Sequence, residues 1–156
     1  MKLRLLLTAL AVVIAAALVG GPALAGTTPP PTVDAKIASG KAAKDLAAAR
    51  ARWRAHGFAS YRFHVQRSCF CNPKTGVATI SVRNGKPGTI ANQLDDVATM
   101  PRLFKLVAGA IKQRVARLTV TYDRTRGYVR SVYIDRSQAI ADEEVGYTIT
   151  KLHKLR

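Results

Sequence analysis

The stretch from Tyr61 to Asn72 constrains the fold most, because its alternating pattern runs directly into the two cysteines of the chain. Its first odd-numbered positions are apolar, and the positions between them are polar. The apolar set is Tyr61, Phe63 and Val65, and the polar set is Arg62, His64 and Gln66. Because successive side chains of a strand point to opposite faces, the pattern predicts a β-strand with one buried face and one solvated face.

Residues 1–25 have the three parts of a secretory signal peptide. Lys2 and Arg4 precede an apolar run from Leu5 to Val19. Helix-breaking glycines follow, and then a small-x-small triplet that ends at Ala25. The apolar run is shorter than the ~20 residues of a membrane-spanning helix. We therefore expect a cleaved signal peptide, a periplasmic or secreted protein, and no transmembrane segment after signal removal.

The mature chain is strongly basic. The sequence has 25 Lys and Arg residues, two of which lie in the signal peptide, so 23 remain against 9 acids and give a formal charge of +14. We expect an unidentified protein or an anionic envelope component as partner, and such a charge favours the second of these. The cations are scattered along the chain and form no single stripe, which argues against specific nucleic-acid recognition.

One domain is predicted after a flexible linker. The linker, residues 26–40, begins with a Thr-Thr-Pro-Pro-Pro run, and residues 41–156 suffice for one core. Apolar spacing predicts a helix over 41–56 that Gly57 ends in a left-handed conformation. A second helix is predicted to begin near Thr99, with a proline in its first turn.

Period-two alternation predicts the strands, over residues 59–67, 77–83, 86–90, 118–122, 128–135 and 145–152. Asn84-Gly85 is a strong hairpin signal between two of them. The predicted order is helix, three strands, helix, three strands. We expect an α+β fold in which an antiparallel sheet of about five to six strands carries two helices on one face and leaves its other face open to water.

Cys69 and Cys71 are predicted to form a disulfide, because export brings the chain into an oxidising compartment. Alternate residues on a flat strand lie roughly 6.6 Å apart, so a bridge requires a bend at Phe70. So small a ring contributes only about 1.5 kcal/mol and acts as a local brace. A redox role is an alternative, although the chain lacks the Cys-x-x-Cys pattern of thiol oxidoreductases. Free or metal-binding cysteines are a third interpretation.

No pattern of an enzyme is present. The histidines have no nucleophile or acid at a recognisable spacing, and no glycine-rich loop opens a helix. The acidic run from Asp142 to Glu144 lacks the spacing of a calcium loop, and in so basic a chain we expect it to pair with Lys or Arg. We therefore expect no catalytic residue, no metal site and no cofactor.

The open face of the sheet is the best candidate for a working surface. It is dense in hydroxyls and cations, and we select Arg62, His64, Arg83 and Tyr133 as partner-binding residues. A competing interpretation is that threonine and arginine simply suit a solvated sheet. The leading hypothesis is a non-enzymatic binding module that uses this face. The alternatives are attachment of a basic domain to anionic envelope polymer or lipid, and a thiol-disulfide role.

A set of short motifs between Asp45 and Ile149 adds to this interpretation. The motifs are Trp53, Tyr61-x-Phe63, Cys69-x-Cys71, Val82-x-Asn84-Gly85, Leu103-Phe104, Tyr122-Asp123, Gly127-Tyr128, Ile134-Asp135 and Asp142-Glu143. Together they resemble a bacterial family of exported small domains, often lipoproteins, whose function is unknown. The chain departs from that family in lacking the lipid-bearing cysteine and in having Val129 where proline is usual. The resemblance implies an envelope location and carries over no catalytic residue.

Overall fold

The computed structural model describes residues 32–69, 76–90, 94–140 and 142–156. Its helices are α1 (Ala35–Ala38), α2 (Lys41–His56), the 3-10 turn η1 (Asp95–Val97) and α3 (Met100–Gln113). Its strands are β1 (Tyr61–Cys69), β2 (Ala78–Arg83), β3 (Lys86–Pro87), β4 (Arg117–Tyr122), β5 (Val129–Asp135) and β6 (Val145–Lys154).

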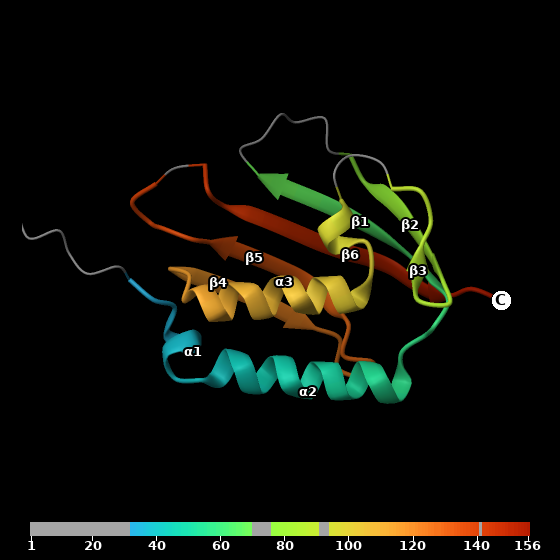
Figure 1. The fold of residues 1–156 in the computed structure, drawn as a ribbon, viewed down its shortest axis with the longest axis horizontal. Coiled ribbons are helices and arrows are strands. Elements are labelled where there is room, and N and C mark those ends of the chain that lie inside the picture. Colours follow the sequence, from blue (N-terminus) through green and yellow to red (C-terminus); the bar gives the residue numbers. More distant parts are fainter. Residues whose placement is uncertain (1–31, 70–75, 91–93, 141) are drawn as a thin grey trace, which may run out of the picture.

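The strands form one antiparallel sheet in the order β3-β2-β1-β6-β5-β4. The long helices α2 and α3 lie side by side on the same face of this sheet (Figure 1). The predicted α+β fold is therefore confirmed, including its two groups of three strands, each preceded by a long helix. The short α1 and η1 are additional.

The core lies between the helices and the sheet. Tyr61, Phe63 and Val65 are at most 2% exposed, so the odd-numbered face of β1 is the buried one, as predicted. Trp53 of α2 packs edge-on against the Tyr61 ring, with the ring centroids 5.3 Å apart. The Tyr61 hydroxyl in turn accepts a hydrogen bond from Met100 N at 2.9 Å. One aromatic residue of β1 thus contacts α2 and the first turn of α3.

The helix ends follow local sequence, with one exception. Thr99 caps α3 by accepting a hydrogen bond from Arg102 N, and a proline occupies the first turn, as predicted. Gly57 does end α2, but its φ of −77° and ψ of −177° are extended, so the predicted left-handed conformation is wrong. A side chain at Gly57 would collide with the carbonyl and indole of Trp53. Glycine is required there by this close approach.

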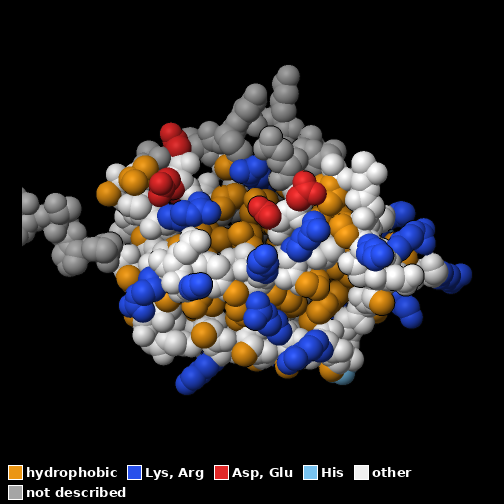
Figure 2. Space-filling view, in the orientation of Figure 1, with side chains coloured by type: hydrophobic (Ala, Val, Ile, Leu, Met, Phe, Trp, Pro, Cys, Tyr) orange, Lys and Arg blue, Asp and Glu red, His pale blue; other side chains and the backbone are white. Residues whose placement is uncertain are grey.

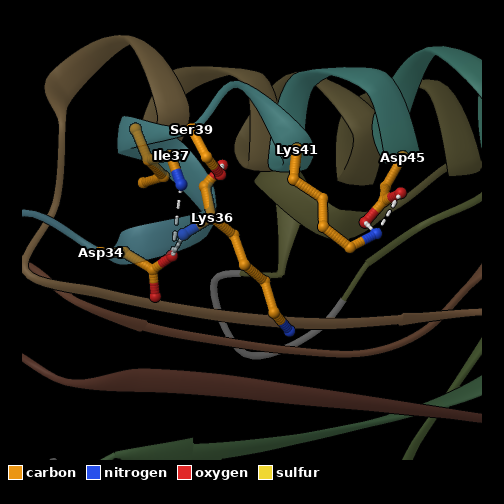
Figure 3. Close-up of polar contacts among 6 residues, drawn as sticks. All are labelled: Asp34, Lys36, Ile37, Ser39, Lys41 and Asp45. Carbon is orange, nitrogen blue, oxygen red and sulfur yellow. Dashed lines mark hydrogen bonds and ion pairs between the residues drawn. The ribbon is translucent and has the colours of Figure 1, made fainter.

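The short α1 lies within residues 26–40, the expected linker, and packs onto the domain. Figure 3 shows the Asp34 carboxylate accepting hydrogen bonds from the backbone nitrogens of Lys36 and Ile37. The other Asp34 carboxylate oxygen accepts a hydrogen bond from Leu118 N of β4 at 3.0 Å. Ile37 is 6% exposed and belongs to the core. The folded unit therefore includes α1.

The two tight turns of the described chain use positive φ angles. Asn84 and Gly85, at φ of 47° and 76°, connect β2 to β3, which confirms the predicted hairpin. The third strand is shorter than expected, since it ends at Pro87. Gly127, also at φ 76°, closes the turn between β4 and β5 against the backbone of α2. No helix among the described residues has the length and hydropathy needed to cross a membrane.

Candidate functional site

Both long helices lie on one face of the sheet, and no described helix covers the opposite face (Figure 1). Its side chains alternate along the strands with the buried ones. We define the open face by these residues, namely Arg62, His64, Gln66, Ser68, Thr79, Ser81, Arg83, Arg117, Thr119, Thr121, Ser131, Tyr133, Thr148, Thr150 and His153. The face predicted from alternation is therefore present as a surface that no described helix covers.

A basic cluster occupies the β1–β2 end of the open face. Arg62 lies opposite Ser81, and its Nε donates a hydrogen bond to Ser81 Oγ at 3.0 Å. His64 lies opposite Thr79 in the same strand pair. Arg83 is the exposed last residue of β2. The structure therefore brings Arg62, His64 and Arg83 together on two neighbouring strands.

A bulge between β1 and β6 adds a second imidazole to this cluster. Arg62 pairs with His153, whereas His64 pairs with Thr150, so β6 has one extra residue over this interval. Lys151 takes up the irregularity with a φ of 50°, and its carbonyl oxygen lies 2.9 Å from His153 Nδ1. The bulge keeps Thr150 and His153 on the open face beside β1. Sequence alternation alone does not reveal this register change.

Tyr133, the fourth predicted residue, lies apart from the basic cluster. It belongs to β5, which β6 separates from β1. The guanidinium of Arg117 lies 5.7 Å from the Tyr133 ring centroid, a cation-π arrangement on the open face. Gly146 of β6 pairs with Tyr133 on one side and with Ser68 on the other. A Cβ at Gly146 would collide with Ser68 Oγ, so glycine permits this close approach. A shallow depression of about 330 Å³ nearby is lined by Ser68, Cys69, Tyr133 and Glu144.

The sign of the charge on the open face is positive. Among the described strands, only β5 contains an acidic residue, Asp135, and this residue is 8% exposed. Arg62, Arg83 and Arg117 are exposed. Hydroxyl groups of threonine and serine fill the space between these cations. The surface can therefore accept anionic groups through both charge and hydrogen bonds.

A separate trough crosses the helix side of the molecule, and the sequence did not predict it. A cavity of about 480 Å³ lies between η1, α3 and the end of β5. A second cavity of about 470 Å³ shares Asp96, Leu106 and Arg136 with it and continues toward the start of β6. Figure 2 shows acidic and basic side chains around a hollow with an apolar base on this side. We call these two joined cavities the trough.

The acidic run near β6 borders the trough, and no described Lys or Arg forms an ion pair with it. Its expected pairing with a neighbouring loop stays a prediction, because Lys74 lies outside the described residues. Arg136 donates to the backbone carbonyl of Glu143 at 3.4 Å and to no described carboxylate. The one ion pair among the residues that the structure describes is Lys41–Asp45, on α2 (Figure 3). Within the same residues, no group of three metal-ligating side chains is assembled.

The predicted pairing of the two cysteines is not tested by the described residues. Cys69 ends β1 opposite Val145 of β6. Cys71 and Phe70 lie outside the described residues. The bridge between Cys69 and Cys71 and the bend at Phe70 therefore stay predictions.

Comparison with known proteins places the chain in a family and gives no activity. No curated protein matches it, and no solved structure matches it. A family model described as "Family of unknown function" matches residues 45–154, which span the fold from α2 to β6. The chain therefore belongs to the family of unknown function DUF6174.

Proposed function

We propose that this protein is an exported, non-enzymatic binding module whose open sheet face receives an acidic partner surface in the cell envelope. The proposal rests on how the helices and the charged residues are distributed over the two faces of the sheet. Both long helices cover the same side of the sheet, and the side that no described helix covers presents three exposed arginines and a row of hydroxyls. The described strands contain one acidic residue, the buried Asp135. The expected signal peptide at residues 1–25 supports the location.

The residues that make first contact are the arginines of the basic cluster. Arg62 is exposed and donates through Nε to Ser81, and no described residue accepts a hydrogen bond from its terminal N–H groups. Arg83 is exposed at the end of the neighbouring strand. His64 and the Tyr133–Arg117 pair extend the same face toward β5. A partner that spans this face meets charge at one end and an aromatic ring near the other.

The test is capture of a partner from envelope extract on immobilised protein. The variant Arg62→Glu with Arg83→Glu reverses two charges on the open face. Lys44→Glu with Lys112→Glu is the matched control, because it reverses two exposed charges on α2 and α3. The proposal expects the first pair to abolish retention of a band that wild type and control both retain. Equal retention by all three proteins contradicts it.

A second candidate function is attachment by charge alone to anionic polymer or lipid. The helix side favours it, because α2 carries five Lys and Arg residues against one acid and α3 carries three against none. Figure 2 shows these basic side chains spread over the helix side. The positive charge of the molecule is therefore not confined to the open face.

The same two variants separate these functions. Attachment by charge alone predicts equal losses for the open-face pair and the helix-side pair, together with a steep fall in binding as salt rises. Recognition by the open face predicts a loss for the open-face pair only. Vesicles that contain an anionic phospholipid are the probe for attachment, and vesicles of a zwitterionic phospholipid are the reference.

A further inference from the structure

The trough contains two buried charged groups without hydrogen-bond partners. Among the described residues, none gives a partner to Arg67 Nε or to Glu144 Oε2, and both atoms are buried. Both side chains line the cavity of about 470 Å³. Burying a polar atom without a partner costs about 1–3 kcal/mol, and more where the group is charged. Such atoms at the wall of a cavity mark a place where a ligand can complete their bonds.

The two groups line the same cavity and have opposite charge. Arg67 of β1 pairs with Tyr147 of β6, and Cys69 pairs with Val145 two residues further along. Glu144 directly precedes Val145, so the cation and the carboxylate border the same end of the β1–β6 pair. A ligand in this cavity can therefore meet both a positive and a negative group.

The hydroxyl of Tyr147 adds a polar group to this cavity. Burial raises the pKa of this hydroxyl, and the charges of Arg67, Asp96 and Arg136 act on it as well. Tyr147 is 9% exposed, and the cavity that it lines is also lined by Asp96 and Arg136. Neutral at physiological pH, the hydroxyl can both donate and accept a hydrogen bond.

The floor of the trough is apolar. Leu106 of α3 lines both cavities, and Val145 lines the second one. Gly109 of α3 has no side chain, and a Cβ there would meet nothing within 4 Å, so the trough is widened beside the helix. An aliphatic or aromatic group can therefore lie on this floor while its charged end reaches Arg67 and Glu144.

We propose that the trough binds a small zwitterion, an α-amino acid with an apolar side chain. Its carboxylate pairs with Arg67 and its ammonium group pairs with Glu144, while the side chain lies on Leu106 and Val145. A simple anion would leave Glu144 unpaired beside a second negative charge. A simple cation would leave Arg67 unpaired beside a second positive charge. A ligand that carries both charges can satisfy both orphaned groups.

Most of the lining of this site lies in α3, η1 and the helix side of β6, although Glu144 also lines the depression beside Tyr133. The four partner-binding residues of the open face, namely Arg62, His64, Arg83 and Tyr133, do not line the trough, so the two proposals can fail independently. The amino-acid site also goes beyond the binding module proposed above, since its ligand is a small molecule.

Isothermal titration with three related probes tests the assignment. Leucine carries both charges, N-acetyl-leucine lacks the ammonium group, and leucinamide lacks the carboxylate. Phenylalanine and alanine vary the side chain. We expect leucine or phenylalanine to bind at least tenfold more tightly than both derivatives and than alanine. Tenfold corresponds to about 1.4 kcal/mol. No binding of any amino acid at millimolar concentration, or equal affinity for leucine and its derivatives, overturns the proposal.

Two variants assign the charges to their residues. Glu144→Gln is expected to weaken leucine at least tenfold and to leave N-acetyl-leucine unchanged. Arg67→Met is expected to weaken leucine and N-acetyl-leucine and to leave leucinamide unchanged. Arg54→Met on α2 is the matched control and should bind leucine as wild type does, because Arg54 is exposed and lines neither cavity of the trough. The proposal is wrong if the control loses as much affinity as Arg67→Met.

The thermal midpoint of unfolding distinguishes a ligand-binding role of Arg67 from a purely structural one. Because Arg67 Nε is buried without a described partner, Arg67→Met should keep or raise the thermal midpoint of the free protein while it abolishes the rise caused by leucine. A structural arginine would instead lower the midpoint when replaced. A lowered thermal midpoint of Arg67→Met, together with unchanged leucine binding by Glu144→Gln, contradicts the assignment.

Discussion

Arg62 Nε donates a hydrogen bond to Ser81 Oγ at 3.0 Å, across the β1–β2 pair on the open face. Arginine has a rigid fork of N–H donors, so this single bond orients the remaining donors toward solvent. Ser81→Ala should therefore weaken partner binding severalfold by freeing the Arg62 side chain, while the free energy of unfolding changes by no more than about 0.5 kcal/mol. Binding and urea unfolding measure the two effects. Ser39→Ala on α1 is the control, and an equal loss of binding there contradicts the role of Ser81.

Tyr61 supports the packing of α3 on the sheet through its hydroxyl. Tyr61→Phe removes the acceptor of Met100 N in a buried place and should lower the free energy of unfolding by about 1–3 kcal/mol. Tyr128→Phe is the control, because its ring is half-buried and no described hydrogen bond uses its hydroxyl. Urea denaturation monitored by circular dichroism measures both variants. Equal losses would mean that the Met100 bond adds nothing.

Alanine substitutions at Gly127 and Gly85 separate the energetic cost of a strained backbone from the cost of a steric collision. Both have a φ of 76°, so alanine at either position adopts an unfavourable left-handed conformation. A Cβ at Gly85 meets nothing within 4 Å, whereas at Gly127 it collides with the Ala49 carbonyl and the Arg52 side chain. Gly85→Ala should cost about 1 kcal/mol of unfolding free energy, and Gly127→Ala clearly more. Similar costs would show that the turn is not pressed against α2.

Ionisation of Tyr122 makes the free energy of unfolding depend on pH in the alkaline range. Burial, and then the charge of Asp45, raise its pKa from 10.0 to about 12. The folded state thus holds the proton more tightly than the unfolded state. This contribution is fully present below about pH 10 and is lost as the pH rises toward about 12. Urea unfolding from about pH 9 to about pH 12 should show a smaller decline for Tyr122→Phe than for wild type. Parallel declines would contradict the assignment.

Elements that depend on local sequence were predictable. The helix over residues 41–56 has the predicted bounds, because its apolar spacing and its terminal glycine are local signals. The Asn84-Gly85 hairpin was predictable for the same reason, since positive φ angles restrict the residue types. The alternation of β1 likewise identified its buried face and therefore the open face.

Features that depend on distant contacts were not predictable. The acceptor for Leu118 N is Asp34, 84 residues away, so a stretch that reads as linker contributes a helix to the domain. The trough requires η1, α3 and β6 to meet, and no periodicity records where they do. Tyr133 shares a face with Arg62, yet strand order places β6 between their strands. Alternation in the sequence identifies the sheet face on which a residue lies. It does not identify the neighbours of that residue on adjacent strands.

Site-specific photo-crosslinking in intact cells tests the central claim most directly. A photoreactive amino acid replaces Thr79 or Thr148 on the open face, or Ala48 or Lys112 on the exposed side of α2 and α3. The account predicts a crosslinked partner from both open-face positions and none from the helix positions. Adducts from Ala48 and Lys112 with none from Thr79 and Thr148 would contradict it.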